Sequence, residues 1–278
     1  MKYRVLLLLI SLGFSVSIGC LELFAQGANP LEPEAAPPRL YIGPVVGYNK
    51  VFQTGNFASF ADEARCPTFV DGSGNGFFAG MTAEFLMGDP KNSKSSIIVR
   101  ALYNSMPSSF TQEGDNLPSL VILNGQQTVI RTSTQHTADI AYTTADVEVM
   151  YKFNLGNTPL VIMAGVAPGL VIQKHITQKF KLVNATDASG KAVDAIFVPD
   201  AKYSYEDGGK TAIIKDYDIE NASGIRFAIK AGVGYEFILK KIFVVPSINY
   251  NFGLTNVNTT DSWKVSALQA QVDVRFAL

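Results

Sequence analysis

The chain has 278 residues, with 23 Lys and Arg against 24 Asp and Glu, and a formal net charge of −1 at pH 7. This balance excludes a bulk electrostatic attraction for nucleic acid or anionic membranes. Beyond the N-terminus no apolar run reaches the roughly 20 residues that a transmembrane helix needs, which excludes a helical membrane protein but leaves a membrane barrel open.

The N-terminus has the pattern of a signal peptide. Lys2 and Arg4 precede an apolar stretch over residues 5–16, and a cleavage point after Ala25 predicts a signal peptide over residues 1–25. An alternative is a lipoprotein signal in which Cys20 is lipidated. Both interpretations predict export across the inner membrane.

Residues 26–38 are rich in Pro, Ala and Glu, which favours an extended periplasmic linker. Cleavage after Ala25 leaves Cys66 as the single cysteine, so no internal disulfide is expected. We expect one domain over residues 39–278.

Eight segments of this domain alternate apolar and polar residues, which is the period of a β-strand with two different faces. Residues 224–239 alternate most regularly, with Ile229 and Val233 on one face and Arg226 and Lys230 on the other. In chain order the predicted strands are Leu40–Lys50, Gly76–Met87, Ser95–Ser105, Tyr142–Leu155, Leu160–Gln173, Gly224–Leu239, Ile242–Thr255 and Leu268–Leu278.

The connections between these strands are alternately short and long. Residues 88–94, 156–159 and 240–241 are tight turns, whereas the long connections are 51–75, 106–141, 174–223 and 256–262. Membrane barrels have short periplasmic turns and long extracellular loops. The sequence therefore predicts an all-β, eight-stranded antiparallel up-and-down transmembrane β-barrel with both termini in the periplasm.

Segments inside the long loop 174–223 leave a ten-stranded barrel as the alternative. Residues 176–183, 192–198 and 211–217 alternate like strands, but their charges favour extensions above the membrane. Prolines at positions 44, 168 and 246 each lack a ladder hydrogen bond, so bulges are expected there.

The predicted inner faces carry five acidic and five basic residues. Eight strands enclose room for side chains alone, and a buried charge is tolerated there when it is paired. A balanced set predicts a plugged lumen rather than a solute channel, with a narrow ion or proton path as the alternative. The predicted charge network is Glu84, Arg100, Asp146, Glu148, Lys152, Arg226, Lys230, Glu236, Asp273 and Arg275.

The sequence contains little that indicates catalysis. Its two histidines are His136 and His175. Ser133 and Asp139 lie near His136 in the sequence, which allows a hydrolase hypothesis. The alternative is that both histidines are solvated loop residues. Residues 71–76 place oxygen ligands at alternate positions, as in a calcium loop, but fit a glycine turn better. No zinc, phosphate or dinucleotide motif is present. We expect no enzyme activity, no metal and no cofactor.

Short strings of residues carry a family resemblance. The closing Val272–Leu278 resembles that of small Gram-negative outer-membrane barrels of the OmpA/OmpX type, and Tyr41–Tyr48 (YIGPVVGY) and Ala231–Phe237 (AGVGYEF) are similar to PorT-like outer-membrane barrels. The resemblance implies an outer-membrane location, contact with its lipid, and insertion by the barrel-assembly machinery, with Phe276 and Leu278 as the assembly signal. A PorT-like relationship would imply a role in protein secretion.

The leading hypothesis is a non-enzymatic integral outer-membrane barrel that is structural or binds an unknown extracellular or envelope protein through its long loops. The candidate contact surface mixes aromatic residues with charges. It consists of Phe180, Phe197, Tyr203, Tyr205 and Tyr217. The alternatives are a component of a secretion system and a soluble periplasmic ligand-binding barrel anchored through Cys20. No nucleic-acid partner is expected.

Overall fold

The computed structural model describes residues 38–58, 68–90, 92–114, 117–187, 189–239 and 242–278. The predicted signal peptide, Cys20 and Cys66 lie outside these residues, as does all of the predicted linker except Pro38. Within the described ranges, no helix is both long enough and apolar enough to span a membrane.

The described residues form fourteen strands and one short 3-10 helix. In chain order these are β1 (Leu40–Ala58), β2 (Thr68–Leu86), β3 (Ser95–Ser105), β4 (Ser108–Glu113), β5 (Leu117–Leu123), β6 (Gln126–Asn154), β7 (Leu160–Thr186), β8 (Ala195–Phe197), β9 (Ser204–Glu206), η2 (Asp207–Gly209), β10 (Thr211–Asp218), β11 (Ile225–Tyr235), β12 (Phe237–Leu239), β13 (Ile242–Gly253) and β14 (Lys264–Ala277).

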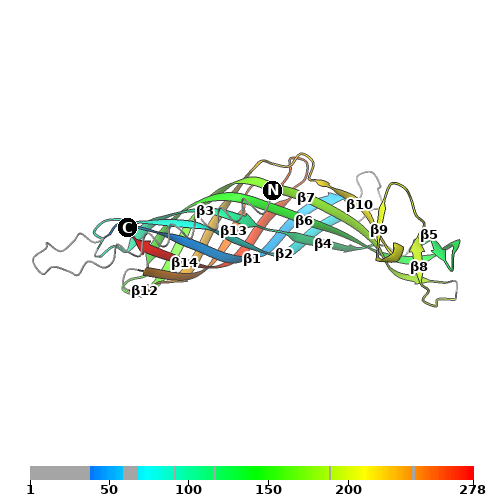
Figure 1. Cartoon of the computed structure of the whole chain (residues 1–278), viewed down its shortest axis with the longest axis horizontal. Coiled ribbons are helices and arrows are strands. Elements are labelled where there is room, and N and C mark those ends of the chain that lie inside the picture. The colour runs from blue at the N-terminus through cyan, green and yellow to red at the C-terminus, as the bar shows by residue number, and fades with distance from the viewer. Residues whose placement is uncertain (1–37, 59–67, 91, 115–116, 188, 240–241) are drawn as a thin grey trace, which may run out of the picture. The chain divides into compact units, whose positions relative to one another are not determined.

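Eight of these strands pair antiparallel, each with the next, and the series returns to its start (Figure 1). The order is β1–β2–β3–β6–β7–β11–β13–β14–β1. Each strand of this ring overlaps one predicted strand. As a count for the chain, however, the prediction of eight strands is wrong, because five further strands form in predicted loops and β12 is separated from β11 at Glu236. Extended segments beside an open sheet edge pair their backbone groups there.

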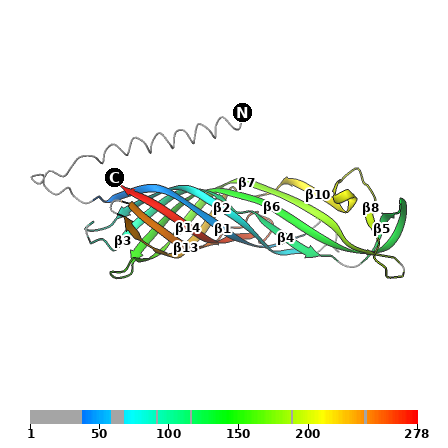
Figure 2. The ribbon, with the colours of Figure 1, turned by 60° about the horizontal axis from the view of Figure 1, so that its bottom comes forward.

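β6 and β7 continue far beyond the other strands of the ring and pair along most of their length. We call residues 117–137 and 179–213 the arm. It consists of these extensions of β6 and β7 together with β5, β8, β9 and the first part of β10. Figures 1 and 2 both show β5 and β8 at the end of the sheet away from the C-terminus. Of the segments considered for a ten-stranded barrel, 176–183 continues β7, whereas 192–198 and 211–217 pair in the arm or along its base, so none adds a strand to the ring.

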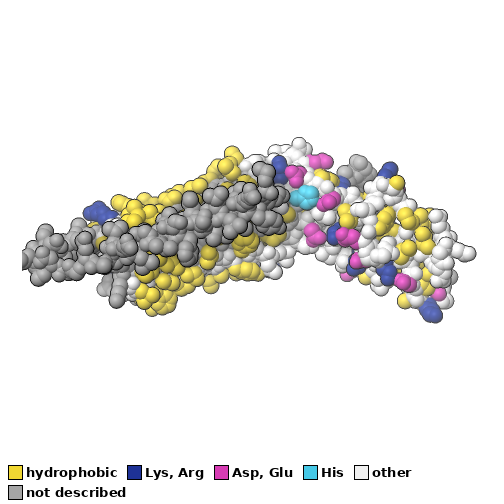
Figure 3. All heavy atoms as spheres, viewed as in Figure 1, with side chains coloured by type: hydrophobic (Ala, Val, Ile, Leu, Met, Phe, Trp, Pro, Cys, Tyr) yellow, Lys and Arg dark blue, Asp and Glu magenta, His cyan; other side chains and the backbone are white. Residues whose placement is uncertain are grey.

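Burial alternates along the ring strands as the sequence predicts. In β11, Phe227 and Ile229 are 49% and 47% exposed, whereas Arg226 and Lys230 are 2% and 0% exposed. Figure 3 shows hydrophobic side chains over the part of the surface formed by the ring, and charged side chains gathered toward the arm. The ring is therefore apolar outside, and its charged side chains are buried inside together with apolar clusters such as Val45, Phe78 and Leu102.

Two local predictions are wrong. Pro44, Pro168 and Pro246 lie in unbroken register, and the irregularities fall elsewhere, for example between Thr143 and Thr144. Residues 71–76 are not a turn but part of β2. A Cβ atom on Gly74 would lie 2.0 Å from the Pro107 carbonyl oxygen, so this glycine permits a close backbone approach.

Candidate functional site

The ten charged residues predicted for the lumen are all buried inside the ring. Eight of them form one continuous chain of ion pairs in which basic and acidic side chains alternate. The chain runs Lys230, Glu148, Arg100, Asp273, Arg275, Glu84, Lys152, Glu236. Four positive and four negative charges make it neutral, so each buried ion has an opposite charge beside it.

Glu84 is the centre of the half of this ion-pair chain that lies toward the short turns. Its carboxylate pairs with both Lys152 and Arg275, and it also accepts a hydrogen bond from Ser96. Lys152 in turn donates to Glu236 at 2.8 Å. These contacts join β2, β3, β6, β14 and the junction after β11 across the interior.

Arg100 is the centre of the other half. Its guanidinium lies 2.8 Å from Asp273 and 3.2 Å from Glu148, and a further N–H approaches the sulfur of Met150 at 3.0 Å. Glu148 also accepts two hydrogen bonds from Lys230, at 2.7 and 3.0 Å. The ion-pair chain thus joins strands that are far apart in the sequence.

The remaining two predicted charges, Asp146 and Arg226, are not part of this chain. Asp146 accepts a hydrogen bond from Asn104 at 2.7 Å. Arg226 donates to Asn251 at 2.8 Å and to the Val265 carbonyl oxygen at 2.9 Å. Both residues lie between the ion-pair chain and the arm.

A series of buried amides follows in the same direction, and it includes residues for which the sequence predicted no role. Asn49 donates to Asn104 at 2.7 Å and accepts from Gln269 at 2.7 Å. Gln53 accepts a hydrogen bond from the indole N–H of Trp263 at 2.9 Å. Asn49 and Gln53 share the inward phase of β1, so extending the predicted strand past Lys50 would have identified Gln53.

The ring is closed at its arm end by an aromatic cluster, which we call the lid: Phe57, Phe69, Phe110 and Trp263. Phe57 stacks on Trp263 with ring centroids 4.7 Å apart and lies 5.1 Å from Phe110. All four side chains are buried, and Met106 and Ile140 belong to the same core. The ion-pair chain, the amides and the lid are thus successive layers of buried side chains inside the ring.

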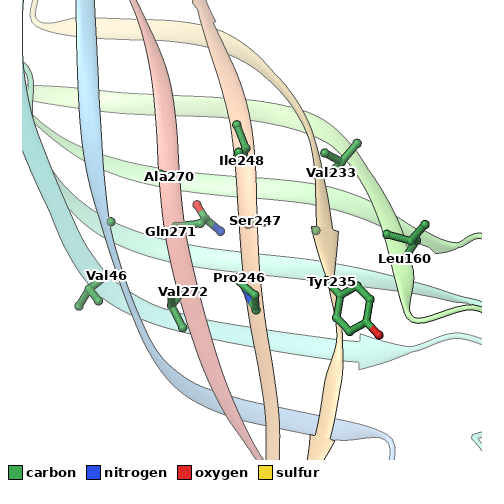
Figure 4. A pocket seen from close by; sticks show the side chains of 12 residues that line it. Val46, Leu160, Val233, Tyr235, Pro246, Ser247, Ile248, Ala270, Gln271 and Val272 are labelled. Carbon is green, nitrogen blue, oxygen red and sulfur yellow. The ribbon is translucent and has the colours of Figure 1, made fainter.

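The outer face has a different character. A shallow hollow of about 700 Å³ lies where β1, β14, β13 and β11 run side by side (Figure 4). Val46, Val272, Val233 and Tyr235 are among its lining residues, and no charged side chain lines it. This surface suits contact with hydrocarbon.

The five aromatic residues predicted as a contact surface are only partly brought together. Phe180 stacks on Phe197 at 5.3 Å, and Phe197 lies 6.5 Å from Tyr205. Tyr203 is exposed, whereas Tyr217 packs against the core that contains the lid. The arm therefore uses three of these side chains to hold β8 and β9 against β7.

The two histidines lie in contrasting environments. His136 is buried against Phe180, with ring centroids 4.6 Å apart, and burial lowers its pKa to about 4. Ser133 and Asp139 lie on the opposite face of β6 from His136, so the three residues do not form a triad. Sequence proximity on a strand does not place side chains three positions apart on the same face.

His175 lies beyond the predicted membrane segment of β7. Its ring nitrogens lie 2.8 Å from Asp216 and 3.4 Å from Asp218. The hydrogen bond with Asp216 raises the pKa of His175, and the same bond lowers the pKa of Asp216. Within the described part of the chain no three His, Cys, Asp or Glu side chains are arranged to hold a metal ion.

Comparison with known proteins gives structural similarities alone. No family model and no curated protein matches the chain. Among solved structures, Neisserial surface protein A has 12% identity, a TM-score of 0.32, and coverage of 86% of this chain and 97% of its own.

The attachment invasion locus protein Ail of Yersinia pestis has 11% identity, a TM-score of 0.34, and coverage of 86% and 99% of the two chains. The outer membrane protease OmpT from Escherichia coli has 6% identity, a TM-score of 0.28, and coverage of 90% and 100%. With TM-scores this low, the fold of this chain rests on its own strand pairing, and the PorT-like relationship remains a prediction.

Proposed function

We propose that the protein is an integral outer-membrane β-barrel whose eight ring strands span the bilayer, and that it is a non-enzymatic platform for the arm. The observation that carries this proposal is the inverted distribution of side chains in the ring. In water, exposed residues such as Ile229 would be hidden and Lys230 would be hydrated. Hydrocarbon outside the ring accounts for both placements at once.

The filled interior supports a barrel that is closed to solutes. A wide channel would leave space between its inward side chains, and water would screen an unbalanced charge. Here eight of the ten inward charges are paired into a neutral chain, and the lid covers the arm end. An eight-stranded barrel encloses only enough volume for such side chains.

The soluble alternative, a periplasmic ligand-binding barrel anchored through Cys20, requires the opposite distribution of residues. A soluble barrel keeps apolar side chains inside to hold its ligand. Phe227 and Ile229 instead lie outside, and Arg226 and Lys230 lie inside. Phe276 and Leu278, the proposed assembly signal, are likewise exposed at the end of the final strand.

The arm is the part of the protein that extends beyond the lipid-facing surface, so we propose that it contacts an extracellular or envelope protein. Its exposed surface mixes Tyr203 with ion pairs such as Lys179–Glu206 at 2.9 Å and Lys210–Asp194 at 2.6 Å. Protein interfaces are enriched in aromatic side chains and have a polar rim.

Cysteine labelling of intact cells tests the membrane placement. In a Cys66→Ser background, we expect Tyr203→Cys to react with a membrane-impermeant maleimide and Ile229→Cys to remain unlabelled until the protein is denatured. Val233→Cys, on the same face of β11, is the matched control for Ile229→Cys. Equal reaction of Ile229→Cys and Tyr203→Cys in intact cells would contradict the proposal.

Removal of the arm tests partner binding. Thr111 pairs with Thr137, and Lys179 pairs with Ile213, so Asn-Gly turns can replace residues 112–136 and 180–212 without disturbing the ring. Heat-modifiable gel migration checks that the ring still forms. We expect the shortened protein to lose the partners that the intact protein retains in pull-downs from outer-membrane extract, and identical partner sets would refute this role.

A further inference from the structure

Asp146 and Arg226 face each other across a glycine inside the ring. Asp146 on β6 and Arg226 on β11 are both in register with Gly169 on β7, which lies between them. A Cβ atom on Gly169 would lie 2.0 Å from Oδ1 of Asp146. The carboxylate therefore lies over the glycine, in the space that any other residue would occupy.

Several polar atoms of this pair have no protein partner. Nε and Nη1 of Arg226 and Oδ1 of Asp146 make no hydrogen bond to any described residue, although both side chains are only 2% exposed. Nδ2 of Asn251 and Oε1 of Gln269, also buried, are in the same condition within the described ranges. Unpaired donors and acceptors thus occur together in this layer.

Unpaired polar atoms also occur in the ion-pair chain, such as Nε of Arg100 and Oδ1 of Asp273, but each of those groups makes at least one ion pair. Among the described residues, neither Asp146 nor Arg226 makes an ion pair within 4 Å. Glu148, the next inward position after Asp146, receives two hydrogen bonds from Lys230 and one from Arg100. Burial of an ionised group without such compensation costs several kcal/mol.

The Thr144 hydroxyl, at the preceding inward position of β6, is the neighbouring protein group for Asp146, and it too makes no hydrogen bond to a described residue. The layer therefore holds buried donors and acceptors on Thr144, Asp146 and Arg226 that require a partner.

We propose that this layer is a hydration site, in which at least one water molecule bridges Arg226 and Asp146. The water accepts a hydrogen bond from the Arg226 guanidinium and donates one to Oδ1 of Asp146. An anion would be repelled by Asp146 and a cation by Arg226, whereas water satisfies a donor and an acceptor together. This inference concerns the interior alone and does not depend on the partner of the arm.

The site is enclosed on both sides along the barrel axis. The ion-pair chain lies on the periplasmic side, and the buried amides and the lid lie on the other. Water held there exchanges slowly with the solvent. The lid, rather than the ionic groups, is then the dry barrier at the arm end of the ring.

Water contacts measured by NMR on the full chain in detergent micelles test the proposal. We expect a cross-peak between water and the Nε–H of Arg226, assigned by its loss in Arg226→Lys. The indole N–H of Trp263, which donates to Gln53 at 2.9 Å, is the internal control and should show none. Absence of the Arg226 cross-peak, or a direct hydrogen bond from Arg226 to Oδ1 of Asp146, would overturn it.

A glycine substitution gives an independent test. In Gly169→Ala the new Cβ displaces the Asp146 carboxylate, so we expect the Arg226 water cross-peak to disappear. Gly224→Ala, two residues before Arg226, is the control that should retain it, because its Cβ would meet nothing within 4 Å. An unchanged cross-peak in Gly169→Ala would show that Asp146 is not the second partner. If Gly169→Ala does not fold, the comparison of Arg226 with Trp263 in the unmodified protein decides.

Discussion

The Arg100 guanidinium lies 2.8 Å from the carboxylate of Asp273, although 173 residues separate them in the sequence. Both side chains are fully buried, and the contact joins the third strand to the last. Because Asp273 also pairs with Arg275 at 2.9 Å and Arg100 with Glu148, this contact connects the two halves of the ion-pair chain.

Removal of Arg100 should therefore be costly. Arg100→Met leaves Glu148 and Asp273 each with one partner fewer in a buried site, and we expect a loss of about 3–5 kcal/mol in unfolding free energy. Urea unfolding in micelles, followed by loss of heat-modifiable migration, measures it. In the double variant Arg100→Met with Asp273→Asn, the loss should be smaller than the sum of the two single losses, whereas strict additivity would show that the pair is not coupled.

The lid makes a separate prediction. Trp263 is 2% exposed, stacks on Phe57 and donates to Gln53, so Trp263→Ala removes a large buried side chain and leaves Gln53 unpaired. We expect a loss of about 3–5 kcal/mol in the same unfolding assay. Trp263→Phe should recover most of it, because the ring packing remains, and equal losses in the two variants would contradict the packing explanation.

The buried histidine predicts how the arm responds to acid. The folded-state pKa of His136 is lowered to about 4, below its ordinary value of 6.5, so its contribution to stability is present above pH 6.5 and is lost as the pH falls toward 4. We expect proteolysis of the arm to accelerate over this range. His136→Phe should largely remove the acceleration, and an unaltered pH profile in that variant would assign the effect to another group.

The exposed histidine should titrate in the opposite direction. Its hydrogen bond with Asp216 raises the pKa of His175 above 6.5, so this contact stabilises β10 against β7 at lower pH and is lost as the pH rises through the raised pKa. NMR titration of the two histidine rings measures both values. Asp216→Asn should lower the pKa of His175 more than Asp218→Asn, because the Asp218 contact is longer, and the reverse order would contradict this assignment.

The sequence was most informative about the ring and least informative about the arm. Strand Ser95–Ser105 has its predicted bounds, and the predicted inward phase places Lys230 and Arg275 inside. The segment predicted as loop 106–141 instead continues into β6, because its polar alternation resembles a loop when it has no apolar face toward lipid. These residues of β6 form a strand because their backbone pairs with β7.

Alternation with a period of two is a local property, so the sequence by itself determined which side chains face the interior and which face outward. It did not determine which inward charges meet. That depends on the register between distant strands and on the space left by residues such as Gly169, and tertiary structure alone decided that Glu148 pairs with Lys230 while Asp146 and Arg226 remain apart. Contacts of this kind are set by the closure of the ring, which no single segment encodes.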